Sequence, residues 1–266
     1  MSAARPVAVI TGASAGIGAE LARQFAQGGN DLVLVARRKD KLTELAYSLA
    51  SAHGVTVEVV ALDLAAPNAG QALANELATA GCEPRYLVNN AGFGLVGFAA
   101  DLSRDEQLAM IDLNVRLLTD LSLRFTDSLA RNKGGLLNVA SVAGFLPGPR
   151  MAVYYATKAF VLSFSEALNR ELEARGVRVT VLCPGPVPTE FQARAGVPGK
   201  LGPAFLEQTA SAVAKAGYDG LMHGKRLVVP GFGNKLATLM VRVLPRGAVL
   251  SLTGSRQKMH RRAGNA

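Results

Sequence analysis

The sequence predicts an α/β fold, a three-layer sandwich whose doubly wound parallel sheet has about seven strands. Short β-branched runs alternate with longer stretches of helical periodicity, which is the pattern of repeated strand–helix–strand units. The strand candidates are apolar on both faces, as in Leu32-Val33-Leu34-Val35. Burial on both faces is typical of a parallel sheet covered by helices.

The expected elements follow one another without a linker or internal repeat before about residue 233. The predicted strands are residues 6–11, 31–36, 55–62, 86–89, 136–140, 177–183 and 226–230. The predicted helices are residues 17–28, 40–53, 68–80, 104–131, 151–175 and 204–217. We expect one domain over residues 1–232 and a basic helical extension with a frayed end over residues 233–266.

The composition is that of a globular domain with an aliphatic core. The chain has 266 residues, 49% hydrophobic and 6% aromatic, with no tryptophan. Two cysteines, Cys82 and Cys183, suit a reducing cytosol, although one bond between them stays open. No apolar run approaches the ~18 residues of a membrane span, and the first apolar run is too short for a signal peptide. We therefore expect a cytoplasmic protein.

The net charge of +9 belongs to the C-terminal part of the chain. Asp219 is the last acidic residue, and nine basic residues follow it. The preceding residues balance, with 20 basic and 20 acidic groups. Because the excess is local and no basic or aromatic repeat accompanies it, the sequence does not predict binding to nucleic acid.

A segment rich in small residues, Thr11-Gly12-Ala13-Ser14-Ala15-Gly16-Ile17-Gly18, joins the first strand to the first helix. Small residues let the backbone approach a pyrophosphate, and the helix N-terminus supplies free N–H groups and a positive dipole end. The spacing is Gly-x-x-x-Gly-x-Gly, and a plain tight turn is the alternative. Its position after an apolar N-terminal strand favours a nucleotide site.

The end of the second strand predicts which nucleotide binds. Many NAD-binding folds place a carboxylate there, whereas this chain has Arg37 and Arg38. A guanidinium binds a 2′-phosphate through charge-assisted hydrogen bonds, so we expect NADP(H), with Ser14 as a further donor. The alternative is that both arginines only solvate a loop. Asp63, after the third strand, either meets the adenine amino group or caps a helix.

A third set of residues predicts carbonyl chemistry. Tyr154 and Lys158 lie four residues apart on one helix face, and Ser141 lies thirteen residues before the tyrosine. An ammonium beside a phenol lowers the phenol pKa from about 10, so Tyr154 would exchange a proton with an alkoxide or alcohol. Ser141 would hydrogen-bond the substrate oxygen. Taken alone, Tyr-x-x-x-Lys on a helix is also expected by chance.

Together these motifs resemble the short-chain dehydrogenase/reductase family over about residues 5–232. The resemblance implies a Rossmann-type domain, an NADP-preferring branch close to bacterial 3-ketoacyl and hydroxysteroid reductases, and a homodimer or homotetramer. The matching residues are Thr11-Gly12-x-x-x-Gly16-Ile17-Gly18, Asp63, Asn89-Asn90-Ala91-Gly92, Asn114, Ser141, Tyr154-x-x-x-Lys158 and Pro184-Gly185-x-x-x-Thr189.

The resemblance also implies residue roles. Tyr154 is the acid/base, Lys158 holds the nicotinamide ribose and lowers the Tyr154 pKa, and Ser141 binds the substrate oxygen. Asn114, in the long helix, anchors a water next to Lys158. The spacing selects Tyr154 over Tyr155, which is expected to pack. The predicted cofactor site comprises Gly12, Ser14, Gly16, Ile17, Gly18, Arg37, Arg38, Asp63, Leu64, Asn90, Ala91, Gly92, Tyr154, Lys158, Pro184, Gly185, Val187 and Thr189.

The substrate is expected to be a lipophilic ketone or aldehyde that accepts a hydride from NADPH. Residues 190–205, rich in glycine and proline, are predicted to form a mobile lid. The alternative is that the apolar residues named for the substrate only roof the domain. The predicted substrate site comprises Ser141, Phe93, Phe145, Tyr154 and Phe191, with Leu146, Pro147, Met151, Val187 and Phe205 around it.

The extension carries a basic amphipathic pattern that ends at Pro245. Such a helix packs on a neighbouring subunit, lies peripherally on an anionic membrane, or meets an acidic partner, and the sequence leaves these open. The apolar stripe is Leu236, Leu239, Met240, Val243 and Leu244, and the basic residues are Lys235, Arg242 and Arg246.

The alternative to an oxidoreductase is a catalytically silent NADP(H)-binding sensor or scaffold. The intact set of Asn114, Ser141, Tyr154 and Lys158 argues against it. Serine hydrolysis is not predicted, because Ser141 lies outside a Gly-x-Ser-x-Gly elbow. No metal site is predicted, since three scattered histidines and two distant cysteines give no ligand spacing.

Overall fold

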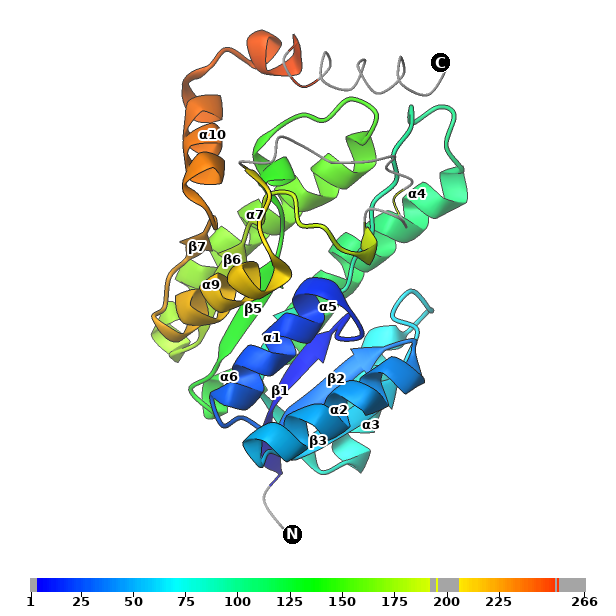
Figure 1. Ribbon diagram of the computed structural model, residues 1–266, viewed down its shortest axis with the longest axis vertical. Coiled ribbons are helices and arrows are strands. Elements are labelled where there is room, and N and C mark those ends of the chain that lie inside the picture. The colour runs from blue at the N-terminus through cyan, green and yellow to red at the C-terminus, as the bar shows by residue number, and fades with distance from the viewer. Residues whose placement is uncertain (1–3, 192–194, 196–205, 252, 254–266) are drawn as a thin grey trace.

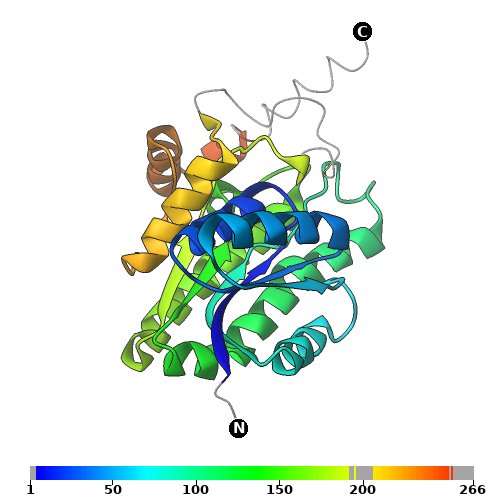
Figure 2. The same cartoon turned by 60° about the horizontal axis from the view of Figure 1, so that its bottom comes forward.

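The structure is a computed structural model that describes residues 4–191, 195, 206–251 and 253. A seven-stranded sheet lies between helices on both faces (Figure 1, Figure 2). Its order is β3-β2-β1-β4-β5-β6-β7 and every neighbouring pair is parallel, so the predicted doubly wound sheet is confirmed. The strands are β1 Arg5–Thr11, β2 Leu32–Ala36, β3 Val57–Ala61, β4 Cys82–Asn89, β5 Gly135–Val139, β6 Arg178–Leu182 and β7 Leu227–Val228.

The helices form two layers, followed by a last helix, α10, after the edge strand. Their bounds are α1 Gly16–Gln27, α2 Lys39–His53, α3 Ala69–Thr79, α4 Arg104–Ile111, α5 Leu118–Arg124, α6 Thr126–Arg131, α7 Ala152–Leu172, α9 Ala210–Met222 and α10 Phe232–Val243. α1, α2 and α9 share one buried cluster with the sheet, and α3 to α7 share another. Successive residues of β1 alternate between the clusters, as a pleated strand requires.

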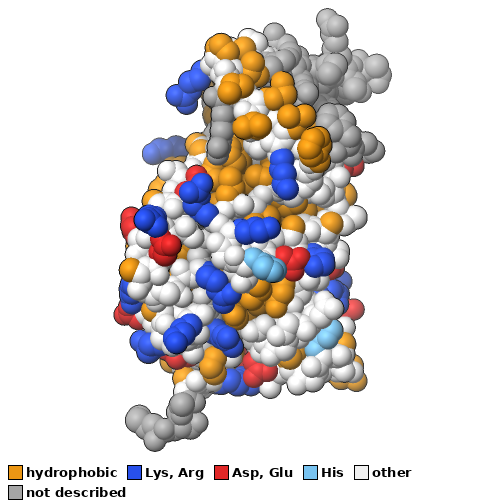
Figure 3. Space-filling model, turned by 90° about the vertical axis from the view of Figure 1, so that its left-hand side faces the viewer, with side chains coloured by type: hydrophobic (Ala, Val, Ile, Leu, Met, Phe, Trp, Pro, Cys, Tyr) orange, Lys and Arg blue, Asp and Glu red, His pale blue; other side chains and the backbone are white. Residues whose placement is uncertain are grey.

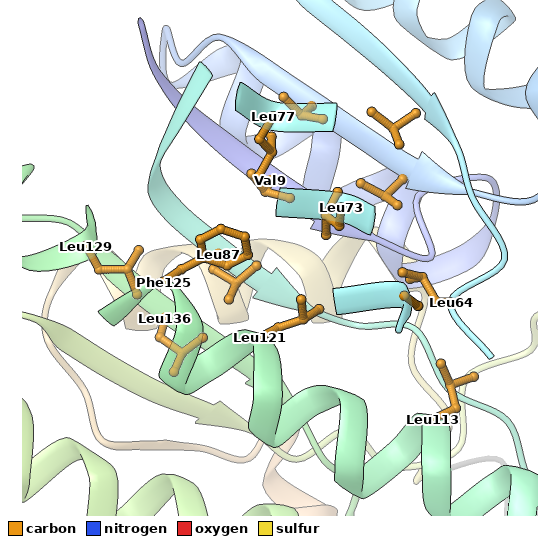
Figure 4. Close-up of a cluster of buried hydrophobic side chains, with 14 of the residues drawn as sticks. Val9, Leu64, Leu73, Leu77, Leu87, Leu113, Leu121, Phe125, Leu129 and Leu136 are labelled. Carbon is orange, nitrogen blue, oxygen red and sulfur yellow. The ribbon is translucent and has the colours of Figure 1, made fainter. Parts of the chain in front are cut away.

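Aliphatic side chains dominate the core, as the composition predicted. Figure 4 shows the cluster under α3 to α6, where Leu73 and Leu77 lie near Val9 of β1. Each fully buried leucine contributes about 2 kcal/mol relative to an exposed one. Leu64 and Leu113, at one side of this cluster, also line the cavity described below. The core and the functional cavity therefore share a wall.

The bounds of the helix predicted at residues 104–131 are confirmed, but the helix is not one continuous α-helix. α4 ends at Ile111, a π-helical turn spans Asp112–Leu117, and α5 and α6 separate at Phe125, whose φ is −98° and ψ is 6°. A π turn adds a residue to one helical turn and is frequent at functional sites. It displaces Asn114 from α-helical register, which the apolar periodicity does not reveal.

The helix predicted at residues 204–217 is present but shifted, because α9 runs from Ala210 to Met222. Thr209 caps it by accepting a hydrogen bond from the Ala212 N–H at 3.2 Å. Its glycines are not breakers. A Cβ on Gly217 would lie 2.7 Å from Leu182, and one on Gly220 would lie 2.3 Å from Val228. These glycines let the helix pack closely on β6 and β7.

Other boundaries move by a few residues. The strands predicted at 55–62 and 226–230 shorten to β3 and β7, whereas β4 begins earlier than residue 86. The helix predicted at 151–175 ends at Leu172 and continues as the 3-10 turn Glu173–Arg175.

Both cysteines are buried free thiols. In the described part of the chain, no helix has the length and apolarity needed to cross a bilayer.

A buried polar ladder connects the sheet to the helices on one face. Asn89 of β4 donates from Nδ2 to Asn138 Oδ1 at 2.9 Å and to Ser122 Oγ of α5 at 3.1 Å. Asn138 of β5 donates from Nδ2 to Ser165 Oγ of α7 at 2.9 Å. All four side chains are at most 4% exposed. The ladder thus fixes α7 against the end of β4.

We predict that Asn138→Ala lowers the free energy of unfolding by about 2–4 kcal/mol, because it leaves a cavity and buried groups without partners. Urea denaturation followed by circular dichroism measures the loss. Asn75→Ala, at an exposed asparagine of α3, is the matched control and should change stability by less than about 0.5 kcal/mol. Equal effects of the two substitutions would contradict a structural role for the ladder.

Candidate active site

A cavity of about 530 Å³ opens at the carboxyl ends of the parallel strands, where open α/β sheets bind ligands. Its wall takes residues that follow each strand from β1 to β6. β2 and β5 are three positions apart in the sheet, about 14 Å at the usual strand spacing. The cavity therefore connects the loop after β2 with the residues after β5, and its volume suits a small-molecule or cofactor site.

The turn from β1 into α1 leaves the helix N-terminus bare. The N-cap, Ala15, makes no side-chain hydrogen bond, and the first turn has no acidic residue. Gly12 has φ +67°, and a Cβ there would lie 2.8 Å from Asn90 Nδ2. A Cβ on Gly18 would lie 2.2 Å from the Gly12 carbonyl oxygen. This cradle of small residues and free N–H groups fits a pyrophosphate.

Polar side chains bind the end of β1 to the end of β4. Thr11 Oγ1 donates to the Val88 carbonyl at 3.1 Å and accepts from the N–H groups of Asn90 and Ala91, both at 3.0 Å. Asn90 Nδ2 donates to the Thr11 carbonyl at 2.9 Å. These bonds place the glycine turn and Asn90 on one wall of the cavity.

Arg38 contacts the glycine-rich turn between β1 and α1. It donates from Nε and Nη2 to Ser14 Oγ at 3.3 and 3.1 Å. Its Nη2 also forms an ion pair with Glu190 Oε2 at 2.8 Å. The hydrogen bond from Arg38 lowers the pKa of the Glu190 carboxyl. Arg37 lines the cavity beside it, and among the described residues no carboxylate forms an ion pair with it.

Asp63 lies on the cavity wall after β3, but it does not cap a helix. Its Oδ1 accepts from the Ala65 N–H at 3.1 Å and closes a turn. The next helix, α3, begins six residues after Asp63, with Asn68 at its N-cap. The helix-cap interpretation is therefore wrong, and the contact to adenine stays a prediction.

Ser141 and Tyr154 meet in the cavity. Ser141 Oγ accepts from the Ala143 N–H at 3.1 Å and lies 3.4 Å from the Pro184 carbonyl oxygen. Burial raises the pKa of Tyr154, and its hydrogen bond with Ser141 acts in the opposite direction. The phenol is therefore protonated at neutral pH, which suits a general acid.

Lys158 lies one helical turn after Tyr154 and is 6% exposed. Its Nζ donates to the Val139 carbonyl at 2.9 Å and lies 5.8 Å from the centre of the Tyr154 ring. Burial lowers the Lys158 pKa to about 8. The expected lowering of the Tyr154 pKa by Lys158 is not found in this arrangement, because burial of the phenol dominates. An ammonium has three N–H donors, so others are available for ribose hydroxyls.

Asn114 does not reach the cavity wall. Its Nδ2 donates to the Phe93 carbonyl at 2.9 Å and to Thr157 Oγ1 at 3.2 Å, while Oδ1 accepts from the Phe93 N–H at 3.1 Å. A Cβ on Gly92 would lie 2.8 Å from Asn114 Oδ1 and 3.7 Å from Lys158 Nζ. Asn114 therefore holds the strand end behind Lys158, and the water predicted there stays a prediction.

The tertiary structure brings together every residue predicted for the cofactor. Of the residues predicted for the substrate, Ser141, Tyr154 and Phe191 line the cavity. Phe93 and Phe145 do not, because each packs into a hydrophobic cluster behind the wall. Phe205 and most of the predicted lid, residues 192–194 and 196–205, lie outside the described residues.

Two wall residues were missed or misjudged from the sequence. Glu190 faces Arg38 across the cavity, and the clue available was its position next to Thr189. Tyr155 packs against a hydrophobic cluster as expected, but it also lines the cavity beside Tyr154, with their ring centres 6.2 Å apart. Helical spacing alone does not reveal either placement, because the partners come from distant segments.

The fold and the site identify the family. The short chain dehydrogenase family model matches residues 6–197, and the chain belongs to this family. It is therefore an oxidoreductase that acts between carbonyl and alcohol groups in a Rossmann-type fold with a nicotinamide dinucleotide. The protein named sulfoacetaldehyde reductase 2 of Chromohalobacter salexigens is 39% identical over 188 residues, 70% of this chain and 74% of that one.

Solved structures agree with this assignment. A short-chain dehydrogenase from Sphingobium yanoikuyae in complex with NADPH is 33% identical, with a TM-score of 0.77 over 96% of this chain and 95% of that one. A 7beta-hydroxysteroid dehydrogenase is 27% identical, with a TM-score of 0.83 over 94% of this chain and 96% of that one.

We predict that the buried Lys158 ammonium destabilises the cofactor-free protein below its folded pKa of about 8. Between pH 8 and 10.5 the unfolded chain binds more protons than the folded one, so stability rises with pH in this window. Lys158→Met should therefore be more stable than the parent at pH 7. The gap should shrink by on the order of 3 kcal/mol toward pH 10.5.

Urea denaturation of both proteins at pH 7 and pH 10 measures this gap. Lys41→Met, at an exposed lysine of α2, controls for the loss of one positive charge. A gap between Lys158→Met and the parent that stays constant with pH would show that Lys158 is not buried as described.

Proposed function

We propose that this chain is an NADPH-dependent oxidoreductase that interconverts a carbonyl and a secondary alcohol on a lipophilic small molecule. One cavity contains Ser141, Tyr154 and Lys158 near β5 and Arg37 and Arg38 after β2. The observation that carries the proposal is this pairing of a carbonyl-reducing trio with a guanidinium at the position where a carboxylate selects NAD.

The cofactor preference rests on the charges after β2. Arg38 is bonded to Ser14 and to Glu190, and its guanidinium is 42% exposed. A 2′-phosphate would take the place of the Glu190 carboxylate, so Arg38 exchanges one anionic partner for another and no charge becomes unpaired. The exposed ion pair is worth at most about 1 kcal/mol. A phosphate with two or more charge-assisted hydrogen bonds exceeds that.

The proposed chemistry assigns each polar group a task at a stated atom. NADPH, when bound, supplies a hydride. Tyr154 donates its phenolic proton to the substrate oxygen, and the raised pKa keeps that proton in place before the reaction. Ser141 Oγ, fixed by the Ala143 N–H, supports the oxygen as negative charge grows on it. Lys158 binds ribose hydroxyls and supplies the positive charge beside the phenol.

The substrate class rests on the wall around Ser141. Leu146, Met151, Val187 and Phe191 contribute apolar side chains, and Phe191 lies against Tyr154 with ring centres 5.5 Å apart. Apart from Lys158, the charged residues of the described wall are Arg37, Arg38, Asp63 and Glu190, and none of these belongs to α7, the helix that carries Tyr154. The names of similar proteins include both a small sulfonated aldehyde and a steroid, so they do not select a substrate class. The proposal of a lipophilic substrate therefore rests on the apolar wall.

We predict that Arg38→Ala weakens NADPH binding by about tenfold to a hundredfold and leaves NADH binding unchanged, because it removes hydrogen bonds to a dianionic group. Glu190→Gln removes the competing carboxylate and should tighten NADPH binding by about twofold to fivefold, again without effect on NADH. Isothermal titration calorimetry of the parent and both variants with each nucleotide measures the six affinities. Equal losses for NADPH and NADH in Arg38→Ala would sink the 2′-phosphate assignment.

We predict that Tyr154→Phe abolishes turnover, by at least about a hundredfold in kcat, while NADPH affinity changes little. The assay is NADPH oxidation over a panel of lipophilic ketones and aldehydes. Tyr155→Phe, one residue along the same helix, is the matched control and should retain activity. NADPH binding without turnover on any panel member would favour the silent sensor instead.

A further inference from the structure

α10 buries polar side chains and exposes apolar ones. Asn234 and Thr238 point into the body, 2% and 8% exposed, and Asn234 Nδ2 donates to the carbonyls of Leu206 and Pro230 at 3.1 Å. A surface helix ordinarily buries its apolar face. Here the large apolar side chains lie outward, and we call them the outer face of α10: Phe232, Leu236, Leu239, Met240 and Val243, each between 47% and 82% exposed.

The outer face continues beyond the helix. Residues 246–251 are again helical, and Leu250 is exposed there. Figure 1 shows α10 and this segment at the end of the molecule toward which the strands point. In Figure 3, hydrophobic side chains gather over this region with Lys and Arg side chains around them. Packing among the described residues leaves this apolar stripe exposed, and an exposed apolar patch of this kind marks an interaction site.

The charge around the outer face has one sign. Lys235 and Arg246 are exposed beside it, and nine basic residues but no acidic residue follow Asp219 in the sequence. A two-fold interface with a second copy would place the same basic surface opposite itself, and like charges facing each other oppose association. An anionic occupant that also accepts apolar side chains matches both properties.

We propose that the outer face of α10 lies on an anionic lipid surface. Its apolar side chains would enter the boundary between headgroups and acyl chains, and the basic residues would attract the lipid phosphates. A lipid surface fits better than an acidic protein, because the exposed apolar stripe extends from α10 to Leu250 in the following segment, so apolar contact accompanies the basic charge along two helical segments.

The buried side of α10 touches the cofactor cavity. A Cβ on Gly185, a cavity residue, would lie 2.4 Å from Asn234 Nδ2. The lipid surface would thus lie on the other side of the helix that supports this wall. A lipophilic substrate would be concentrated in the membrane next to the enzyme. This last step rests on the proposed function, whereas lipid binding itself does not.

The test is flotation of the full chain with vesicles of phosphatidylcholine, with and without phosphatidylglycerol. We expect binding to the phosphatidylglycerol vesicles at low salt, release at high salt, and little binding to pure phosphatidylcholine. The Leu239→Gln/Met240→Gln double variant should bind at least about tenfold more weakly, because glutamine keeps helix propensity but removes the apolar surface.

Tyr47→Gln on α2, which removes an aromatic residue more exposed than Leu239 or Met240, is the control and should bind like the parent. Unchanged NADPH affinity and circular dichroism show that the double variant is folded. Tyr154→Phe should also bind vesicles normally, so failure of the catalytic proposal and failure of lipid binding are separate results.

Four outcomes would overturn the lipid proposal. The full chain could fail to float with phosphatidylglycerol vesicles, or the double variant could float as well as the parent. Light scattering could instead show that the double variant loses a dimer without any vesicle binding, which would assign the outer face to a second copy. Retention on immobilised polyglutamate without vesicle binding would assign it to an acidic protein partner.

Discussion

The functional cavity depends on the hydrogen-bonded junction between the ends of β1 and β4. The sheet order reverses there, with β2 and β3 on one side and β5 to β7 on the other, so the two loops diverge and leave a crevice. Thr11 is 1% exposed, and its hydroxyl joins three backbone groups across the gap. Because the alternative is a set of buried, unpaired polar groups, the junction keeps the glycine turn and Asn90 on one wall.

Burial then sets the chemistry at the other end of the cavity. The same helix, α7, carries Tyr154 and Lys158 into an apolar environment, which raises one pKa and lowers the other. The Tyr154 phenol therefore keeps its proton at neutral pH. The Lys158 ammonium is destabilised by burial and has N–H donors available for a ligand. The hydrogen bond between Asn138 and Ser165 holds this helix to the sheet. The packing of the fold therefore offsets the unfavourable free energy of burying the Lys158 ammonium.

α10 links this interior to the surface of the molecule. Its buried asparagine supports the cavity wall near Gly185, and its outer face exposes apolar residues where ordinary surface helices expose polar ones. The sequence of this one short helix therefore combines polar residues on its buried side with apolar residues on its exposed side. The inversion explains why the stripe recognised as amphipathic in the sequence does not contribute to the core of this chain.

The sequence by itself determined the fold class and indicated the glycine-rich turn and the Ser141–Tyr154–Lys158 set that share one cavity, because these depend on local periodicity and on fixed spacing along a helix. It failed at the π turn around Asn114 and at the glycines of α9, where packing against distant strands overrides local signals. Only the tertiary structure buried Phe93 in the core, packed Phe145 against a hydrophobic cluster, set Glu190 against Arg38 and directed the apolar stripe of α10 outward. Each of these depends on contacts between segments far apart in the chain, and no spacing within one segment specifies which face a distant neighbour will cover.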